Sequence, residues 1–587
     1  MLYEDIAEQT KSTAMLLQLS KNSSNIRQLL ENEVLIGALA RILYDDWKKS
    51  FDLATNITSI FLNFSFYNDF HPILAHYKIG TACLQITEYE LKRWDIWKKE
   101  ISIDYSSEQR KWIIAIRKQQ ILISVCLNLL LNMTEDIKVE VKLVSRKIVA
   151  LLLKCLSDRN ACLELLLVSV NFLLKLSLFG ENVKEMKNHR IVELLATLFP
   201  IKNDSLRHVV IRLLFNLSFD SDLRNQMVAS GIVSQVAPFL EDNETCVNLL
   251  YQLSINNDAK AMITFTDTIQ VLMRYLLSNQ ATDVMKAILI NIALEKRNAQ
   301  LICGQEGQGL DLLIELVYEQ KDLLILKILR NIASHSGPSQ SMFNKWVPRL
   351  LHSATKSQEN GEIDYFSNWF NLECLRIVSQ LDSVNWLSLI NEFSLIEWIK
   401  QKLNPDTVNE YEDDSALQVL CLVIILCGTM ARQLEAARLL VPLADYFTEL
   451  LSAQQEDDEM VMQIVYVFYT IIIHEELSES LMGGSAQVGA YLLDLMHDSN
   501  APISAICDRA LTIIAERSEE WSRKMDIERF RWHNAQWLEM ITANGDILGD
   551  SAQSDSSDIF SDVLGAEDLL DDTFLNADFN NQLEYDF

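Results

Sequence analysis

Glycine and proline are scarce in this sequence, with 16 Gly and 8 Pro among 587 residues. These two residues mark the tight turns of hairpins and sandwiches, so their scarcity argues against a β-rich fold. Hydrophobic residues make up 49% of the chain, which is ample material for a continuous apolar core. We therefore expect an all-α protein.

Cysteine pairs and leader segments are also missing. The ten cysteines form no C-x-x-C pair, have no histidine at metal-ligand spacing, and are scattered through apolar stretches, as is typical of small core residues. The start, MLYEDIAEQT, lacks the features of a secretory signal. The most apolar runs, near 121–133 and 417–430, are shorter than the roughly 20 residues of a membrane span. These absences predict a reduced cytosolic or nuclear protein without a metal or direct membrane insertion.

No catalytic or nucleotide-binding motif is present. The segment GQEGQG at 304–309 follows an apolar stretch, lacks a lysine and has the wrong order for a dinucleotide fingerprint. No HExxH, GxSxG or kinase signature occurs, and the nine histidines are dispersed. We expect neither an enzyme nor a cofactor.

Positive charge is scarce, since 51 Lys and Arg stand against 81 Asp and Glu, a net charge of -30. Nucleic acid is excluded as a direct ligand, because binding its phosphates needs clustered Lys and Arg. From Trp532 to Phe587 thirteen acidic residues occur without one Lys or Arg. Residues 541–587, rich in Asp, Ser and Asn with isolated apolar residues, are predicted to be a disordered acidic tail. Within it, candidate sites for an acidophilic kinase are Ser554, Ser556, Ser557 and Ser561.

A repeated tetrad is the strongest positive signal. Its central copies are Leu131-Asn132-Met133-Thr134, Leu174-Lys175-Leu176-Ser177, Phe215-Asn216-Leu217-Ser218, Tyr251-Gln252-Leu253-Ser254, Ile290-Asn291-Ile292-Ala293 and Arg330-Asn331-Ile332-Ala333. The second residues are 43, 41, 36, 39 and 40 positions apart. Weaker copies centre on Asn63 upstream and on Ile377, Cys427, Thr470 and Ile513 downstream. Such a period predicts an armadillo or HEAT-like right-handed superhelical solenoid.

The segment after Leu206 illustrates one repeat. Apolar residues recur at helical spacing up to Leu217, a short polar stretch and a second helix follow, and Gly231 precedes a third apolar helix. Glycine suits this break because it tolerates positive φ. One repeat cannot bury this much apolar surface alone, so neighbouring repeats must stack.

The repeats define the expected domain organisation. Residues 1–540 form the solenoid and residues 541–587 the tail. Asn63 and Asn132 are 69 positions apart, which indicates an inserted charged helical hairpin near 90–120. Capping helices are expected near 516–540, because the last repeat has an uncovered face.

The tetrad asparagines are candidates for a peptide-binding or cargo groove. An Asn amide on the third helix of each repeat can satisfy both a donor and an acceptor of an extended peptide; the alternative is that these residues only cap or solvate the helix surface. The predicted groove residues are Asn132, Asn216, Asn291, Asn331, Arg212 and Arg330. The tryptophans that accompany Asn in importin-type grooves are missing, which disfavours a receptor for nuclear signals.

Two further clusters have alternative interpretations. Residues 92–118 hold eight Lys or Arg against four Asp or Glu, with three tryptophans interleaved; this is either a solvated helix anchored by its rings, which we favour, or a docking face for an acidic partner or the tail. An aromatic cluster near the end of the array either caps the last repeat or anchors a partner. It comprises Phe530, Arg531, Trp532, His533 and Trp537.

Several strings resemble the kinesin-associated protein family, the non-motor armadillo subunit of heterotrimeric kinesin-II. They include LYEDIAEQTKSTAMLLQLS, LIGALARILYDDWKKSFDLATNI, FHPILAHYKIG, ELKRWDIW, IRLLFNLSFDSDLRNQMV, LSAQQEDDEMVMQIVYVFY, YLLDLMHDSN and FRWHNAQWLEM. The resemblance implies a non-catalytic adaptor that binds the C-terminal tails of two kinesin-II motor subunits and links them to cargo or transport-train proteins. It implies a cytoplasmic, microtubule-associated location that includes cilium and axon. The family usually carries a further N-terminal region, so Met1 is expected to open a shortened isoform or a truncated gene model.

Within this resemblance, we expect residues from about 454 to 537 to dock the motor tails and the groove around Asn216 to Asn331 to take cargo. The alternative is a catenin-type armadillo adaptor in junctions or transcription, in which the acidic tail recruits partners.

Overall fold

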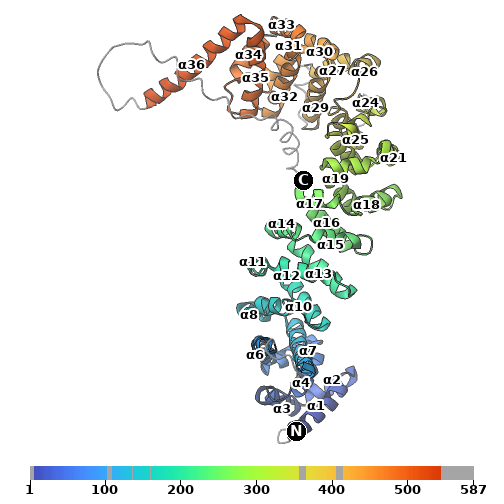
Figure 1. Ribbon diagram of the computed structural model, residues 1–587, viewed down its shortest axis with the longest axis vertical. Coiled ribbons are helices and arrows are strands. Elements are labelled where there is room, and N and C mark those ends of the chain that lie inside the picture. Colours follow the sequence, from blue (N-terminus) through green and yellow to red (C-terminus); the bar gives the residue numbers. More distant parts are fainter. Residues whose placement is uncertain are drawn as a thin grey trace, which may run out of the picture. The chain divides into compact units, whose positions relative to one another are not determined.

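The computed structural model describes residues 5–101, 109–134, 137–158, 160–355, 365–404, 414–484 and 486–543 (Figure 1). In these ranges the regular elements are helices and no strand occurs. The chain divides into two compact units, Met1–Glu295 and Lys296–Phe587. Residues 541–543 of the predicted tail form the end of a helix, whereas the rest of the tail and its four serines lie outside the described residues.

The N-terminal unit contains α1 (Ile6–Ser20), α2 (Ser23–Glu31), α3 (Glu33–Asp46), α4 (Phe51–Ser65), η1 (Asn68–Phe70), α5 (His71–His76), α6 (Ile79–Ile101), α7 (Gln109–Met133), α8 (Ile137–Ser145), α9 (Ile148–Leu156), α10 (Leu163–Leu176), α11 (Gly180–Asn188), α12 (Ile191–Thr197), α13 (Asp204–Leu217), α14 (Ser221–Ala229), α15 (Ile232–Val236), η2 (Ala237–Phe239), α16 (Glu244–Ser254), α17 (Asn257–Ile263), α18 (Thr268–Leu277) and α19 (Asp283–Ile292).

The C-terminal unit contains α20 (Lys296–Cys303), η3 (Gln305–Gly307), α21 (Gln308–Gln320), α22 (Leu323–Ala333), α23 (Pro338–Ser341), α24 (Val347–Thr355), α25 (Tyr365–Val378), α26 (Trp386–Phe393), α27 (Leu395–Leu403), α29 (Asp414–Ala431), α30 (Leu434–Leu440), η4 (Val441–Leu443), α31 (Ala444–Ala453), α32 (Asp458–Ile472), α33 (Glu475–Met482), α34 (Val488–Leu495), α35 (Ala501–Arg517) and α36 (Glu519–Ala543).

The tetrads lie at the ends of the helices that stack to form the core of each unit. In the N-terminal unit, α1, α4, α7, α10, α13, α16 and α19 pack in this order, each on the next (Figure 1). In the C-terminal unit α22, α25, α29, α32 and α35 form the equivalent row, and α36 packs on α35. The apolar tetrad residues, such as Leu176, Leu217 and Leu253, are fully buried. The predicted helical solenoid is therefore confirmed.

The repeat that follows α13 has the predicted glycine break. Asp220 caps α14 by accepting a hydrogen bond from the Leu223 backbone N–H at 2.9 Å. Gly231 then adopts φ +73° directly before α15, and a Cβ on this residue would meet no atom within 4 Å. The backbone conformation, rather than lack of space, is thus what favours glycine here.

The same break occurs in other repeats without glycine. The residues before α9, α12, α27 and α34 also have positive φ, and they are Lys147 (60°), Arg190 (56°), Ser394 (50°) and Gln487 (51°). The helix-to-helix turn is therefore a general property of the repeat. It cannot be recognised from glycine in the sequence, because other residues often occupy the positive-φ position. Stacking of the two flanking helices has to offset the strain of about 1 kcal/mol or more at each such residue.

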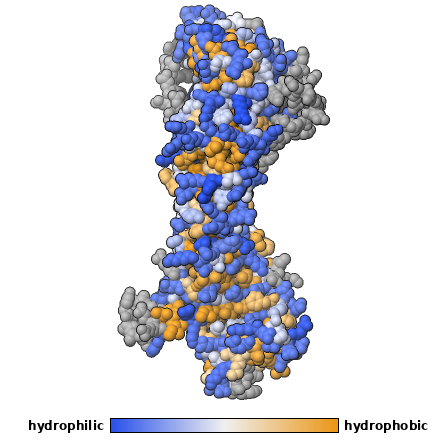
Figure 2. All heavy atoms as spheres, turned by 90° about the vertical axis from the view of Figure 1, so that its right-hand side faces the viewer, coloured by the Kyte–Doolittle hydropathy of each residue, from blue (hydrophilic) through white to orange (hydrophobic). Residues whose placement is uncertain are grey.

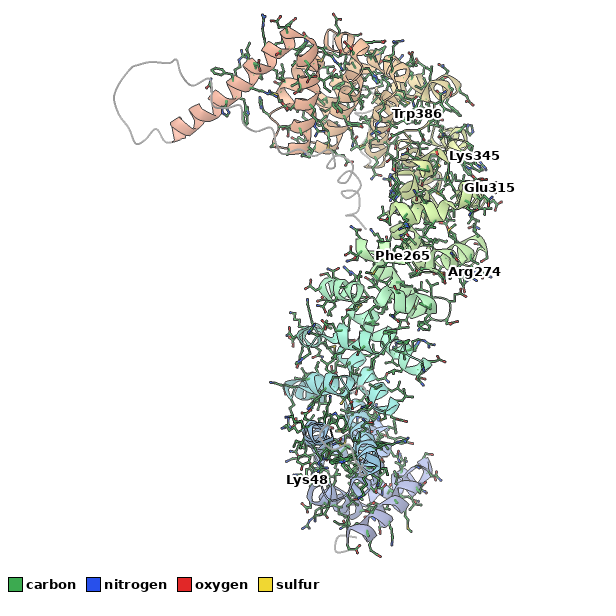
Figure 3. The ribbon with its side chains drawn as sticks, viewed as in Figure 1. Lys48, Phe265, Arg274, Glu315, Lys345 and Trp386 are labelled. Carbon is green, nitrogen blue, oxygen red and sulfur yellow. The ribbon has the colours of Figure 1, made fainter. Side chains whose placement is uncertain are left out.

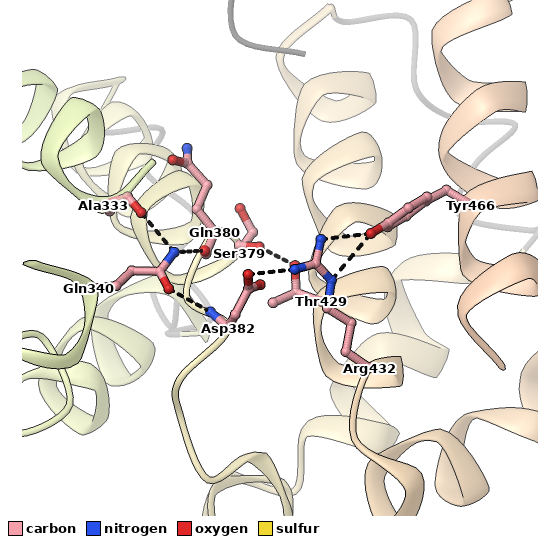
Figure 4. A network of polar contacts seen from close by, with 8 residues as sticks. All are labelled: Ala333, Gln340, Ser379, Gln380, Asp382, Thr429, Arg432 and Tyr466. Atoms are coloured by element: carbon pink, nitrogen blue, oxygen red, sulfur yellow. Dashed lines mark hydrogen bonds and ion pairs between the residues drawn. The ribbon is translucent and has the colours of Figure 1, made fainter. Parts of the chain in front are cut away.

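Glutamine amides join neighbouring repeats by a recurring bidentate contact. Gln340 donates from Nε2 to the Gln380 carbonyl at 2.6 Å and accepts from the Asp382 N–H at 3.3 Å (Figure 4). Gln433 does the same with the Val384 carbonyl and the Trp386 N–H. A further copy joins Gln120 to the Asn160 carbonyl and the Cys162 N–H. Each amide thus satisfies a loop carbonyl and a loop N–H two residues apart.

An arginine reinforces this junction in the C-terminal unit. Arg432 pairs with the Asp382 carboxylate at 2.5 Å and donates to the Tyr466 hydroxyl at 2.7 Å (Figure 4). Thr429, one turn earlier, donates to the Ser379 carbonyl at 2.5 Å. Three successive repeats are therefore linked by side-chain hydrogen bonds as well as by apolar packing.

One sequence expectation needs correction. The apolar run near 121–133 belongs to a longer segment, Lys111–Met133, whose length and composition alone would allow it to cross a membrane. The length of this apolar segment was underestimated from the sequence, because the helix begins before position 121 and includes the charged residues there. This segment is most of α7, which packs on α4, α6 and α10, and half of its most apolar window is buried in the solenoid.

Candidate functional site

The tetrad asparagines form hydrogen bonds between repeats. In each case the Asn Nδ2 donates to the hydroxyl of the Ser that closes the preceding tetrad helix. The pairs are Asn63 with Ser20 (2.9 Å), Asn132 with Ser65 (2.9 Å), Asn216 with Ser177 (3.0 Å) and Asn291 with Ser254 (3.0 Å). The asparagines are half-buried and the serines buried.

Each of these serines relays the contact into its own helix. The Ser177 hydroxyl donates to the Leu174 carbonyl at 2.7 Å while it accepts from Asn216. Ser254 makes the same bond to the Tyr251 carbonyl at 2.7 Å. Both hydrogen-bonding functions of the buried hydroxyl are thereby used, which avoids the cost of an unsatisfied polar group. The amide nitrogen of each of these Asn residues thus donates to the neighbouring repeat, while the amide oxygen belongs to a side chain that is only half-buried.

A groove of about 470 Å³ crosses α10, α13 and α16. Its lining combines amides, cations and apolar side chains, and includes no carboxylate: Asn171, Leu174, Lys175, Leu178, Arg212, Phe215, Asn216, Thr245 and Asn248. Two predicted groove residues, Arg212 and Asn216, therefore lie side by side in one groove. Lys175 and Arg212 favour acidic ligands, and three amides supply donors and acceptors for an extended backbone.

The other predicted groove residues lie elsewhere. Asn132 and Asn291 take part in the inter-repeat bonds of α7 and α19 and do not line this groove. Asn331 is only 6% exposed, and its Oδ1 accepts from Arg330 Nε at 3.4 Å. Arg330 also faces the buried Glu373 carboxylate at 3.8 Å, which Arg376 contacts at 2.7 Å. In the C-terminal unit these residues surround a buried charge.

The predicted aromatic cluster lies on α36. This helix packs through Trp521, which fills the space beside Gly489, and through Met525, which is 7% exposed. Arg529 pairs with Asp508 at 2.5 Å. The Trp532 ring stacks on His497, with ring centroids 4.7 Å apart and an interplanar angle of 7°.

The two sides of this cluster differ. Trp532 keeps 39% of its surface exposed, and Phe530, two residues earlier on the helix, is 58% exposed. Arg531 pairs with Glu528 at 3.4 Å, and His533 faces solvent. Helix α36 contains Trp537, whose side chain lies outside the described residues. The cluster thus combines a capping contact, made by Trp532, with a separately exposed aromatic side chain, Phe530.

The basic segment near 92–118 forms the facing ends of α6 and α7. Arg93 lies over the Tyr89, Phe51 and Trp97 rings, at 5.0, 5.5 and 5.6 Å from their centroids. The Trp97 ring contacts Trp112 edge-on at 5.4 Å. The tryptophan rings therefore anchor this hairpin, as the favoured interpretation requires. Lys48, labelled in Figure 3, adds a cation 4.8 Å from the Tyr89 centroid.

The described residues contain no metal-binding cluster, and most of their thiols are buried. No group of three or more His, Cys, Asp or Glu in the described ranges could hold a metal ion. The ten cysteines are free, and eight are buried. Burial raises the pKa of the Cys155, Cys246 and Cys303 thiols to about 12, which disfavours the reactive thiolate at neutral pH.

Stacked helical repeats of this kind define a helical-repeat solenoid of the armadillo type. A solved structure from a study of the phosphorylation switch that controls the interaction between cadherin and beta-catenin has a TM-score of 0.55, covering 87% of this chain and 97% of that chain at 13% identity. This likeness shows the fold alone. The crystal structure of an engineered protein covers 68% of this chain and 96% of its own, with a TM-score of 0.47 and 16% identity.

A protein-family model that matches almost the whole chain identifies the family. The family model described as kinesin-associated protein (KAP) matches residues 1–575. The chain therefore belongs to the kinesin-associated protein family, in agreement with the strings on which the sequence resemblance rests.

Sequence reasoning missed the Asn–Ser pairing, although the signal is present. A tetrad Asn bonds to a Ser wherever the preceding tetrad ends in Ser: Ser65 precedes Asn132, Ser177 precedes Asn216 and Ser254 precedes Asn291. Asn63 likewise bonds to Ser20, which ends Leu17-Gln18-Leu19-Ser20, a tetrad-like stretch that was not among the predicted copies. Asn331 follows a tetrad that ends in Ala293. The glutamine contacts carry no comparable sequence signal, because their partners are backbone atoms.

Proposed function

We propose that this chain is the non-catalytic adaptor subunit of a heterotrimeric kinesin motor. In this role it binds the tails of two motor subunits and links them to cargo for transport along microtubules in the cytoplasm, including cilia and axons. The match to the kinesin-associated protein family over residues 1–575 is the observation that carries this proposal. A solenoid with separate surfaces suits an adaptor, because catalysis can remain in the motor chains.

Motor tails are assigned to the C-terminal unit, from about Gln454 to the aromatic cluster of α36. The exposed faces of Phe530 and Trp532 support this assignment, because large aromatic side chains dominate binding hot spots. Trp532 is held in place by its stack on His497, so little side-chain freedom would be lost on binding.

Cargo is assigned to the groove of α10, α13 and α16. Its three amides and two cations suit an extended, acidic segment that lies across the stacked helices. Leu174, Leu178 and Phe215 would receive apolar side chains from the same segment. The predicted residues Asn132 and Asn291 would support the N-terminal unit by holding their repeats in register rather than by direct contact. Asn331 and Arg330, which belong to the C-terminal unit, are not assigned to this cargo groove.

Motor binding is tested by purifying the chain from its own cells at low salt and identifying co-purifying proteins by mass. Two distinct kinesin heavy chains at one to one to one are expected, and their recovery should fall for Trp532→Ala combined with Trp537→Ala. Ile527→Ala, an exposed apolar residue of the same helix, is the matched control. Full motor recovery by the double variant would remove the C-terminal assignment, and recovery of junctional or nuclear proteins without kinesin would contradict the adaptor role.

Cargo capture needs variants that leave the stack intact. Asn171 and Asn248 line the groove and, among the described residues, make no hydrogen bond to another repeat. We expect Asn171→Ala, Asn248→Ala and Arg212→Glu to reduce the cargo that accompanies the purified complex while motor binding persists. Lys184→Glu, on an exposed face of α11, is the control for Arg212→Glu. Unchanged cargo recovery with all three groove variants would exclude the groove.

A further inference from the structure

The apolar side of the groove on α10 and α13 continues past the residues that line it. Leu178 and Phe215 line the groove together, and the Phe215 ring contacts the Phe219 ring edge-on, with centroids 5.3 Å apart. Leu174, one turn before Leu178 on α10, also lines the groove. We call Leu174, Leu178, Phe215 and Phe219 the apolar shelf. Because the groove and the ring contact join its members, they form one surface, and all four belong to the N-terminal unit.

Continuity distinguishes the shelf from single exposed apolar residues. Apolar side chains lie among charged ones over the lower, N-terminal helices (Figure 2), so exposure of one residue does not by itself indicate a site. In the shelf, Leu178 is 72% and Phe219 63% exposed, and both adjoin a groove that offers amides to a peptide backbone. A contiguous apolar surface beside convergent polar groups is typical of a binding site.

The backbone on both sides of Phe219 is fixed. The Ser218 carbonyl accepts a hydrogen bond from Arg224 at 3.0 Å. Asp220 caps α14, and its carboxylate pairs with Lys187 at 3.3 Å. The Phe219 ring is therefore held in place before a ligand arrives, which lowers the entropy lost on binding.

Toward the start of α13 the groove is cationic. Arg212 lies one turn before Phe215, and among the described residues it makes no ion pair or side-chain hydrogen bond. Lys175 interacts electrostatically with the Glu140 carboxyl, which is buried on α8. Arg212 is therefore the cation most available to a ligand. In a chain with a net charge of -30, an uncompensated arginine in a groove without a carboxylate indicates an acidic ligand.

The distance between this charge and the shelf limits the ligand. Arg212 and Phe219 are seven residues apart, and Ser218, which follows α13, keeps helical backbone angles. Seven residues of helix rise about 10 Å and return to the same face. An extended peptide advances about 3.3 Å per residue. A ligand residue at Arg212 and another at Phe219 should therefore be about three positions apart.

We infer that the groove and the apolar shelf together bind an extended segment that carries an acidic residue and, about three positions away, a large apolar residue. The acidic residue pairs with Arg212, the apolar residue covers Phe219 and Leu178, and the amides of Asn171 and Asn248 hold the backbone of the segment. The inference rests on the proposed cargo groove and adds the sequence pattern that this groove selects.

Binding of defined peptides to the full-length chain tests this pattern. A short fluorescein-labelled peptide with adjacent aspartates and, about three positions later, a phenylalanine is compared with the same peptide carrying serine for phenylalanine. Fluorescence anisotropy should show about tenfold higher affinity of the wild type for the first peptide. Phe219→Ser should remove this difference, and Leu178→Ser should reduce it. Moving the phenylalanine next to the aspartates should also lower the affinity.

Matched variants serve as controls. Phe66 follows its tetrad as Phe219 does and is 66% exposed, but its tetrad does not line the groove, so Phe66→Ser should retain the full difference between the peptides. Arg212→Glu should weaken both peptides, whereas Lys184→Glu, on an exposed face of α11, should weaken neither. Circular dichroism should show each variant to be folded.

The outcomes separate this inference from the proposed function. If Arg212→Glu abolishes binding but the phenylalanine of the peptide adds no affinity, the cargo groove stands and the role of the shelf is overturned. An equal loss in Phe66→Ser and Phe219→Ser overturns it as well. If binding is independent of Arg212, both the groove and the inference fail. The inference is also overturned if analytical ultracentrifugation shows a wild-type dimer and a monomeric Phe219→Ser variant, because a second copy would then occupy the shelf.

Discussion

Asn216 donates from Nδ2 to the Ser177 hydroxyl at 3.0 Å, across the boundary between two successive repeats. The bond joins the ends of α13 and α10, and Ser177 passes it on to the Leu174 carbonyl. The amide that also lines the groove therefore has a structural role. Mutation of Asn216 alone cannot separate ligand binding from repeat stacking.

A double-mutant cycle measures this bond. Asn216→Ala and Ser177→Ala should each lower the free energy of unfolding by about 1 kcal/mol, because each leaves a half-buried or buried polar partner unsatisfied. The double variant should lose less than the sum, with a coupling of about 0.5–1.5 kcal/mol. Urea unfolding followed by circular dichroism provides the values. Additive losses would mean that the two side chains do not stabilise each other.

Gly231 should be sensitive to a single methyl group. Gly231→Ala is expected to cost about 1 kcal/mol, because alanine is strained at φ +73° although the space is open. Gly180→Ala, at the first residue of α11 and equally free of neighbours, should be neutral or slightly stabilising. Thermal unfolding of both variants tests the distinction. Equal midpoints would show that the positive φ at Gly231 carries no cost.

Gly489 should control the attachment of α36. An added Cβ would lie 2.1 Å from Trp521 Cη2 and 2.7 Å from Met482 Cε, so Gly489→Ala should cost about 1–3 kcal/mol by overpacking. Faster proteolysis between residues 519 and 543 is the expected readout. Trp521→Ala should itself loosen α36, but adding Gly489→Ala to it should cost little more. A further large loss in the double variant would place the clash elsewhere.

Asp220 predicts a dependence of stability on pH. Burial raises the pKa of its carboxyl, but the Leu223 N–H and the Lys187 ammonium outweigh this and hold the pKa below its ordinary value of about 3.9. A carboxyl whose pKa is lowered in the folded state stabilises the folded protein at pH values above its ordinary pKa. This stabilisation is lost as the pH falls through the pKa of the folded state.

The control for this prediction is Asp220→Asn, which keeps the N-cap acceptor but does not titrate. Near pH 7 the wild type should be more stable by about 0.5 kcal/mol, through the pair with Lys187. The difference should shrink between about pH 4 and pH 3, as thermal midpoints will show. A constant difference across this range would mean that the Asp220 carboxylate charge adds no stability.

Several features could be predicted because they depend on residues close together in sequence. The roughly 40-residue tetrad period, the apolar spacing of α13 and the glycine at position 231 each report local conformation. The breaks at Lys147 and Arg190 were not predicted, because a charged residue gives no signal of positive φ. Their conformation is imposed by the packing of the helices on either side.

The candidate site was predicted only in part. Arg212 and Asn216 were identified, but Lys175, Asn171 and Asn248 were not selected. A groove across three helices depends on which side chains of three separate repeats point the same way. These residues do not recur at a fixed interval in the sequence, so no sequence pattern identifies them.

The sequence by itself determined the all-α class, the repeat and the family, because helix periodicity and the long family strings are properties of consecutive residues. Only the tertiary structure decided how the polar residues are used. Asn216 bonds to a serine 39 residues earlier, Gln340 clamps a loop 40 residues later, and Arg330 faces a buried Glu373. These partners meet because helices of neighbouring repeats stack, and the geometry of that stacking is set by the apolar core rather than by the polar residues themselves.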